Sequence, residues 1–114
     1  MKVLVINPGS TSTKVALFLQ QAELWRKTLA HAVEERVPTL VGQLAQRGAT
    51  IRRALEEQGG LESSEMGAVI GRGGLLHPLA GGVYRVNEAM KQDLQSCRYG
   101  THASNLGGLL ADLL

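Results

Sequence analysis

The chain is poor in cysteine and in aromatic residues, and both shortages limit what it can be. It has one cysteine, one tryptophan, one phenylalanine and two tyrosines among 114 residues. A lone cysteine, Cys97, excludes an internal disulfide and a thiolate metal site, and it suits a reducing cytoplasm. Because aromatic residues are scarce, we expect a core built from Leu, Val, Ile and Ala.

An excess of charge of one sign is also missing. Twelve basic and ten acidic residues give a formal net charge of +2 and are mixed along the chain, so nothing indicates a nucleic-acid partner. No apolar run is long enough to span a membrane, and the short apolar start lacks a signal-peptide cleavage site. A length of 114 residues fits one small domain, and a hydrophobic content of 44% is ordinary for a folded protein.

The first eighteen residues predict two strands joined by a turn rich in hydroxyl groups. Apolar runs at Val3–Ile6 and Val15–Phe18 flank the segment Asn7–Lys14, and Pro8-Gly9 ends the first strand. The turn displays one amide, four hydroxyls and a lysine, which together suit a phosphate: Asn7, Ser10, Thr11, Ser12, Thr13 and Lys14. The alternative is an ordinary hairpin whose hydroxyls satisfy their own backbone. A Walker phosphate loop fits poorly, because a strand follows the lysine where that loop requires a helix.

The middle of the chain predicts a strand, a helix and a further strand. Leu24–Ala30 has the alternation of a third, antiparallel strand. Apolar residues from Val37 onward recur at helical spacing, with Pro38 in the first turn and Gly59-Gly60 as the end. Ala68–Ile70 reads as a central strand, parallel to the first. Five charged residues fall mainly on the outer face of the helix and are interpreted as solvated surface: Arg47, Arg52, Arg53, Glu56 and Glu57.

Arg72 follows this last strand directly, within Gly71-Arg72-Gly73-Gly74. Open α/β sheets bind ligands at the carboxyl ends of their strands, and a guanidinium can hold a carboxylate or phosphate with two hydrogen bonds. The alternative is a surface arginine in a flexible loop.

Two helices are expected after an irregular connection over Leu75–Arg85. Asn87 is the predicted N-cap of the first, which ends near Gly100, and Thr101 is the predicted cap of the second. His102 and Asn105 are three residues apart, so both are expected on one side of a helix N-terminus, where an anion is favoured. The alternative is that His102 only caps its helix and Asn105 is a surface amide.

Gly107-Gly108 disfavours the last helix by about 1 kcal/mol per glycine, which predicts close packing there. The helix ends in Leu109-Leu110-Ala111-Asp112-Leu113-Leu114 without a polar terminator, so we expect exposed leucines unless another chain covers them.

Three motifs in this order resemble the butyrate kinase branch of the acetate kinase family. They are Asn7-Pro8-Gly9-Ser10-Thr11-Ser12-Thr13-Lys14, Gly71-Arg72-Gly73-Gly74-Leu75-Leu76 and His102-Ala103-Ser104-Asn105-Leu106-Gly107. The connecting segment Tyr84–Met90 also resembles that branch, and the match spans the chain. The resemblance implies an α/β fold with the ribonuclease H-like mixed sheet of the sugar kinase, heat-shock ATPase and actin superfamily. An asparagine at position 7, where the superfamily usually has aspartate, favours the acyl kinases.

The resemblance further implies reversible transfer of the γ-phosphoryl group of ATP to a short-chain carboxylate, giving ADP and an acyl phosphate, with Mg²⁺ required. By similarity, Asn7 would hold the metal or its water shell. Ser10, Ser12 and Lys14 would hold phosphate oxygens.

The two later motifs would act on the group being transferred. By similarity, Arg72 would grip the carboxylate or the phosphoryl group in flight. His102 would donate a hydrogen bond to the transferring group, and Asn105 would support the same site. His77 and Thr101 depart from the family, which has a basic and an acidic residue there.

Members of the family are about three times this length and carry a second, adenosine-binding domain. Residues 1–114 are therefore expected to be the N-terminal domain of a two-domain enzyme, truncated and inactive alone, and completed by a C-terminal half or a homo-oligomer. One alternative is a non-catalytic binding or assembly module that keeps the fold. Another is an α/β domain without phosphate chemistry.

Overall fold

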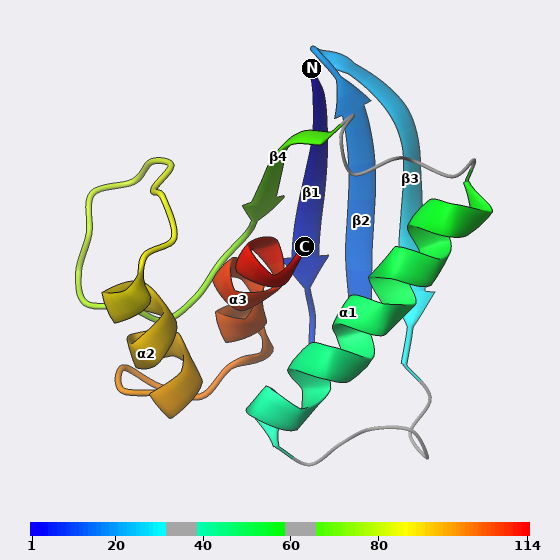
Figure 1. Ribbon diagram of the computed structural model, residues 1–114. Coiled ribbons are helices and arrows are strands. Elements are labelled where there is room, and N and C mark those ends of the chain that lie inside the picture. Colours follow the sequence, from blue (N-terminus) through cyan, green and yellow to red (C-terminus); the bar gives the residue numbers. More distant parts are fainter. Residues whose placement is uncertain (32–38, 59–65) are drawn as a thin grey trace.

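The computed structural model describes residues 1–31, 39–58 and 66–114, and it shows a four-stranded mixed sheet with helices packed on one face (Figure 1). The elements, in chain order, are β1 (Lys2–Pro8), β2 (Ser12–Leu19), β3 (Ala22–Ala30), α1 (Leu40–Glu57), β4 (Met66–Gly71), α2 (Glu88–Ser96), the 3₁₀ helix η3 (Ala103–Asn105) and α3 (Leu106–Leu113). The predicted order of three strands, a helix, a strand and further helices is confirmed.

The strands lie in the order β3-β2-β1-β4. β1 pairs antiparallel with β2 and parallel with β4, as expected for a hairpin followed by a helical crossover. β4 is an edge strand of this sheet, so the prediction of a central position is wrong for the part of the chain that the structure describes. The apolar run Ala68–Ile70 indicated a central strand, but Ile70 is 38% exposed.

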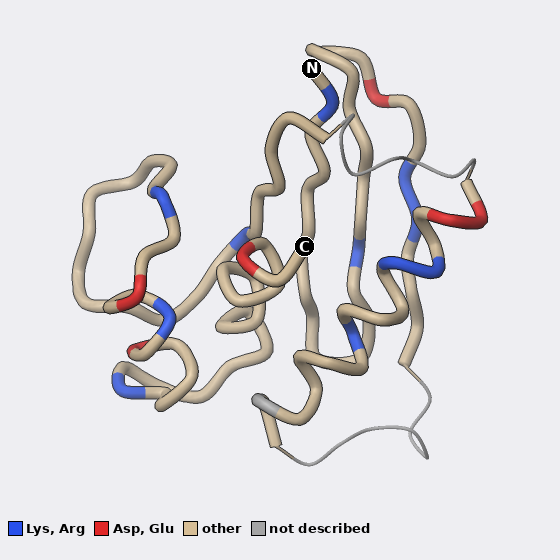
Figure 2. Tube along the Cα trace, viewed as in Figure 1, with Lys and Arg blue, Asp and Glu red and all other residues tan. Residues whose placement is uncertain are grey.

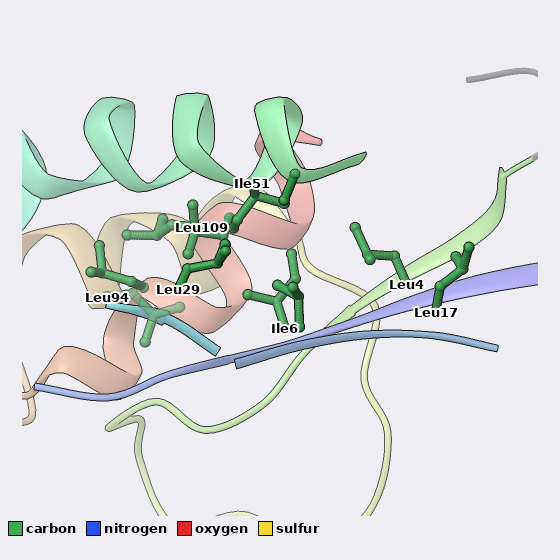
Figure 3. Packing of buried hydrophobic residues seen from close by; sticks show 11 residues of the cluster. Leu4, Ile6, Leu17, Leu29, Ile51, Leu94 and Leu109 are labelled. Carbon is green, nitrogen blue, oxygen red and sulfur yellow. The ribbon is translucent and has the colours of Figure 1, made fainter. Parts of the chain in front are cut away.

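The core lies between the sheet and the helices α1 and α3. Leu4 and Ile6 from β1 and Ile51 from α1 are fully buried there, together with leucines of α2 and α3 (Figure 3). α1 begins at Leu40 because the Thr39 hydroxyl accepts the N–H of Gly42 at 3.1 Å. The predicted helix limits at Val37-Pro38 and Gly59-Gly60 lie outside the described residues.

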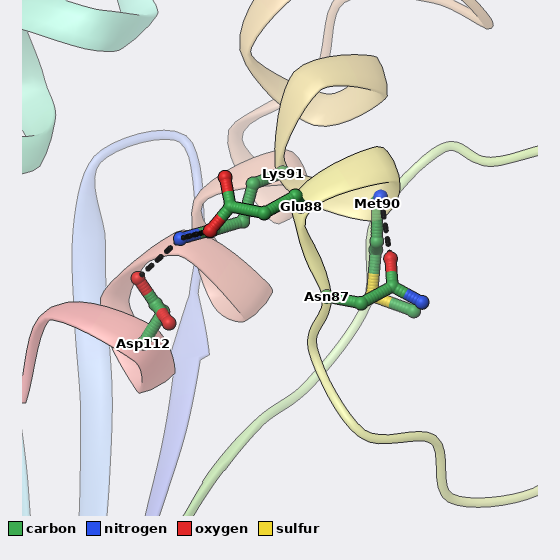
Figure 4. Close-up of polar contacts among 5 residues, drawn as sticks. All are labelled: Asn87, Glu88, Met90, Lys91 and Asp112. Carbon is green, nitrogen blue, oxygen red and sulfur yellow. Dashed lines mark hydrogen bonds and ion pairs between the residues drawn. The ribbon is translucent and has the colours of Figure 1, made fainter.

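The helix predicted after Asn87 is confirmed as α2. The Asn87 side chain caps it by accepting the N–H of Met90 at 2.8 Å (Figure 4). Lys91 lies 2.8 Å from Glu88 and 3.2 Å from Asp112 of α3, and its hydrogen bonds to these two carboxylates raise the pKa of its ammonium group. α2 ends before the expected Gly100, because Cys97 forms a left-handed C-cap at a φ of 54°. The Cys97 side chain is half-buried.

The expectation that the last helix exposes its leucines is largely wrong. Leu106, Leu109 and Leu110 are buried against the sheet and the neighbouring helices, and Leu113 is 40% exposed. Leu109 and Leu110 follow Leu106 by three and four residues, so all three lie on one face of α3, which packs on the sheet and leaves the outer face to Asp112 and Leu113.

The close packing predicted at Gly107-Gly108 is confirmed. A Cβ on Gly107 would lie 2.4 Å from the carbonyl oxygen of Arg72, and a Cβ on Gly71 would lie 1.8 Å from that of Gly107. Two glycines therefore allow the start of α3 to touch the end of β4, backbone against backbone. This contact brings the His102 segment next to the Arg72 segment.

Along the described part of the chain, basic and acidic residues are interspersed over strands, helices and loops (Figure 2). None of the helices described has the length and apolar character needed to cross a membrane.

Candidate functional site

The candidate site lies at the sheet edge where β1 and β4 end. The two strands are parallel, so their carboxyl ends, at Pro8 and Gly71, lie at the same edge. The backbone N–H of Arg72 donates to the carbonyl of Ile6 at 2.8 Å, which holds the start of the Arg72 loop beside the β1–β2 hairpin. The first two predicted motifs are therefore brought together by the topology.

The β1–β2 hairpin presents its polar groups at this edge. The N–H of Gly9 donates to the carbonyl of Ser12 at 2.7 Å, so Ser10 and Thr11 form the exposed tip. Ser10 and Thr11 are exposed and Ser12 is half-buried, and Arg47 of α1 bonds to the carbonyls of Ser10 and Ser12 and not to their hydroxyls. These groups are available to a ligand.

Asn7 and Lys14 lie opposite each other in the β1–β2 register. Their neighbours Ile6 and Val15 are buried on the helix-covered face, so the alternation of the strands puts Asn7 and Lys14 on the other face of the sheet. Arg72 comes one residue after Gly71, which pairs with Ile6. The same alternation, continued by one residue, gives Arg72 the face of Asn7 and Lys14.

The interpretation of the charged residues of α1 as solvated surface is wrong for Arg47. Its side chain is buried, with 3% of its surface exposed, and reaches from α1 to the hairpin turn. Nη1 donates to the carbonyl of Gly9 at 2.8 Å and to the Thr13 hydroxyl at 3.1 Å. The other four charged residues of the predicted cluster are exposed as expected: Arg52, Arg53, Glu56 and Glu57.

A signal for Arg47 is present in the sequence. Leu40, Leu44 and Ile51 pack toward the core, and Arg47 occupies the position between Leu44 and Ile51 at the same spacing of three and four residues. A charged residue in an apolar register is a candidate for a buried polar contact. Thr13 is a second polar residue in the core: it is fully buried, and its Oγ1 lies 2.8 Å from Nε2 of His31.

The third motif adjoins the Arg72 loop. Gly73 and Gly74 have positive φ angles of 87° and 127°, and a Cβ on Gly73 would lie 2.8 Å from Cβ of Ser104. Glycine at both positions lets the loop turn against η3. All three predicted motifs therefore meet at the edge of the sheet where β1 and β4 end.

His102 is the N-cap of this segment, in place of the predicted Thr101. Its Nδ1 accepts the N–H of Ser104 at 3.0 Å, and the ring is exposed. Because Nδ1 accepts a backbone N–H, the neutral ring carries its proton on Nε2. Capping thus coexists with a hydrogen-bond donor that is accessible to a ligand.

Asn105 is fully buried and does not share the exposed side of His102. Its Oδ1 accepts the N–H of Leu75 at 2.9 Å, and its Nδ2 donates to the carbonyl of Gly100 at 2.9 Å. The amide therefore ties the loop after Arg72 to the segment before His102. The prediction that His102 and Asn105 share one side assumed the spacing of an α-helix, and it is wrong because the segment begins as a 3₁₀ turn.

This contact predicts a stability effect for Asn105→Ala. The change leaves the Leu75 N–H and the Gly100 carbonyl without their partner, so we expect a loss of about 2 kcal/mol in the free energy of unfolding. Urea denaturation measures the loss, with Gln95→Ala on the exposed side of α2 as the control. Equal stability of the two variants would mean that the buried amide holds nothing in place.

The donor set at the edge consists of amide, hydroxyl, ammonium and guanidinium groups. Across the described ranges, no three His, Cys, Asp or Glu side chains gather as metal ligands. Mg²⁺, which keeps several waters and binds substrate phosphates, fits the amide oxygen of Asn7 and the neighbouring hydroxyls.

Comparison with known proteins gives the same family as the motifs. The chain is 45% identical over 113 residues to butyrate kinase 1 of Clostridium acetobutylicum and covers 32% of that protein. It is 48% identical over 112 residues to the probable butyrate kinase of Enterococcus faecalis and 43% identical over 112 residues to that of Coprothermobacter proteolyticus. The predicted resemblance to the butyrate kinases is confirmed.

The match to butyrate kinase includes 97% of this chain for the Clostridium acetobutylicum protein. The chain spans about a third of the length of the curated butyrate kinases that it matches. No model of a protein family matches the chain.

Proposed function

We propose that residues 1–114 are the N-terminal part of a butyrate kinase-like enzyme and have a ribonuclease H-like fold. The adenosine-binding domain of that enzyme would correspond to the part of its relatives that this chain does not match. The reaction is transfer of the γ-phosphoryl group of ATP to a short-chain carboxylate, with ADP and an acyl phosphate as products. A lone cysteine is consistent with a cytoplasmic enzyme. The observation that carries the proposal is the convergence of three distant motifs at one sheet edge in a chain similar to butyrate kinases.

The hairpin is proposed to bind the phosphate groups. Ser10 and Ser12 offer hydroxyls, and Lys14 offers an ammonium group on the open face of the sheet beside Asn7. Charge spreads over the phosphoryl oxygens during transfer, so fixed donors at this edge stabilise the transition state. When bound, Mg²⁺ supplies further neutralisation of phosphate charge, and Asn7 is the residue proposed to hold it or its water shell.

Arg72 and His102 are proposed to act on the transferring group. The planar guanidinium of Arg72 can hold a carboxylate or the phosphoryl group through two hydrogen bonds. His102 donates from Nε2, because its Nδ1 is occupied by the Ser104 N–H. Asn105 supports Arg72 and His102 because its buried amide joins the loop after Arg72 to the segment before His102.

A chimera tests the proposal directly. The chain replaces the matching 113 residues of butyrate kinase 1 from Clostridium acetobutylicum, and butyryl phosphate formed from butyrate and ATP is trapped with hydroxylamine. We expect the chimera to be active and the 114-residue chain alone to be inactive.

The matched control is a chimera with the corresponding segment of the Enterococcus faecalis relative, which is 48% identical to this chain. An active control beside a folded but inactive chimera would refute the kinase role and favour a non-catalytic module. Activity of the isolated chain would refute the proposal that the adenosine site lies elsewhere.

A further inference from the structure

Arg47 contacts the proposed phosphate-binding hairpin from the helix-covered side of the sheet. Its guanidinium is buried beneath the turn on the helix-covered side, whereas Asn7 and Lys14 belong to the opposite face of the sheet. Besides the carbonyl of Gly9 and the Thr13 hydroxyl, it donates to the carbonyls of Ser12 at 3.3 Å and Ser10 at 3.5 Å. One side chain thus holds three carbonyl groups of one short turn.

This arrangement dictates where the amide groups of the turn point. Each described peptide bond is trans, so a carbonyl and the N–H of the next residue point in opposite directions. Because Arg47 draws the carbonyls of Gly9 and Ser10 toward α1, the N–H groups of Ser10 and Thr11 are directed away from it. Neither N–H donates to another described residue. Both are therefore left available for an anion.

The choice of arginine matters for this task. The guanidinium is planar and permanently charged, and its donors diverge in a fixed fork that can serve several acceptors at once. Gln43, one helical turn earlier, accepts from Nη2 at 2.9 Å and fixes the orientation of the fork. A charged donor also polarises the peptide groups that it contacts, which strengthens the donors on their other side.

We infer that Arg47 is a positioning residue that holds the Gly9–Ser12 turn with its amide N–H groups directed at the bound phosphate. It acts through the backbone of the turn and does not contact the ligand. This inference rests on the proposed phosphate-binding function of the hairpin and adds a residue from α1 to it.

The test compares Arg47→Lys with wild type in the full 114-residue chain. Lysine keeps the charge and the stem but loses the fork, so the chain is expected to fold while the turn loses its fixed shape. Two quantities are measured by nuclear magnetic resonance. They are the dissociation constant for inorganic phosphate and the hydrogen-exchange rate of the Gly9 N–H, which donates to Ser12 within the turn.

We expect Arg47→Lys to weaken phosphate binding by about tenfold or more and to speed Gly9 exchange by a similar factor, because several charge-assisted hydrogen bonds are lost. Arg52→Lys, on the exposed side of the same helix, is the matched control and should change neither quantity. Gln43→Ala should give a smaller effect in the same direction, and it serves as the second variant if Arg47→Lys does not fold.

The outcomes separate this inference from the proposed function. Unchanged phosphate affinity in a folded Arg47→Lys variant would overturn the positioning role and give Arg47 a purely structural one. If the wild-type chain binds no phosphate, the proposed function of the hairpin fails, and Gly9 exchange then decides alone. Faster exchange in Arg47→Lys supports control of the turn by Arg47, and unchanged exchange overturns it.

Discussion

Gly107→Ala is expected to destabilise the fold by about 3 kcal/mol or more, because the new methyl group has no space. It would lie 2.4 Å from the carbonyl oxygen of Arg72 and 3.1 Å from the nitrogen of the same residue, both backbone atoms. Alanine favours a helix over glycine by about 1 kcal/mol, which does not offset a backbone clash of this size. Gly71→Ala, aimed at Gly107 from the other side, should be at least as damaging.

Urea unfolding measures both changes against Gly81→Ala. A Cβ at Gly81 meets no atom within 4 Å, so that variant should remain near the wild-type stability. Because the glycine contact joins β4 to α3, its disruption should also move the His102 segment away from Arg72. Wild-type stability of Gly107→Ala would show that the two backbones do not touch in solution.

The second large effect is on catalysis. In the active chimera, Arg72→Gln and Lys14→Gln are each expected to lower kcat/KM about 100-fold or more, since each removes a charged donor from the phosphate site. Arg72→Lys should restore little of this loss if the planar fork matters, because an ammonium group cannot form the paired hydrogen bonds.

The controls for this experiment remove the same charges at other surface positions. Arg98→Gln alters an exposed arginine beside Asp93, and Lys27→Gln alters a lysine of β3 that pairs with Glu57. Both should retain kcat/KM within about threefold of the parent chimera, because surface ion pairs contribute little. If Arg72→Gln behaves like Arg98→Gln, then Arg72 has no part in the reaction.

Local patterns in the sequence were sufficient to predict most of the fold. The apolar runs of β1 and β2, the alternation in β3, the helical spacing before Glu57 and the Asn87 cap depend on neighbouring residues, and each predicted element is confirmed. The place of β4 in the sheet was predicted wrongly. An apolar run reports burial of its side chains, and it does not report how many strands lie beside it.

Less of the site could be predicted from the sequence, because its geometry depends on contacts between residues that are distant in the chain. Arg47 is 38 positions from Gly9, and its burial follows from how α1 crosses the sheet. Asn105 was predicted beside His102 from helical spacing, but the 3₁₀ turn redirects its amide into the interior. The sequence predicted close packing at Gly107, but it did not indicate that Gly71 is the residue packed against it.

The central claim is that three segments distant in sequence form one anion site. The most direct measurement is a titration of the isotope-labelled chain with inorganic phosphate at constant ionic strength, followed at each backbone amide. The account predicts that the amides of Ser10 and Thr11, of Gly73 and Gly74, and of Ala103 and Ser104 shift together with one dissociation constant. Shifts confined to a single segment, or separate dissociation constants for the three, would contradict it.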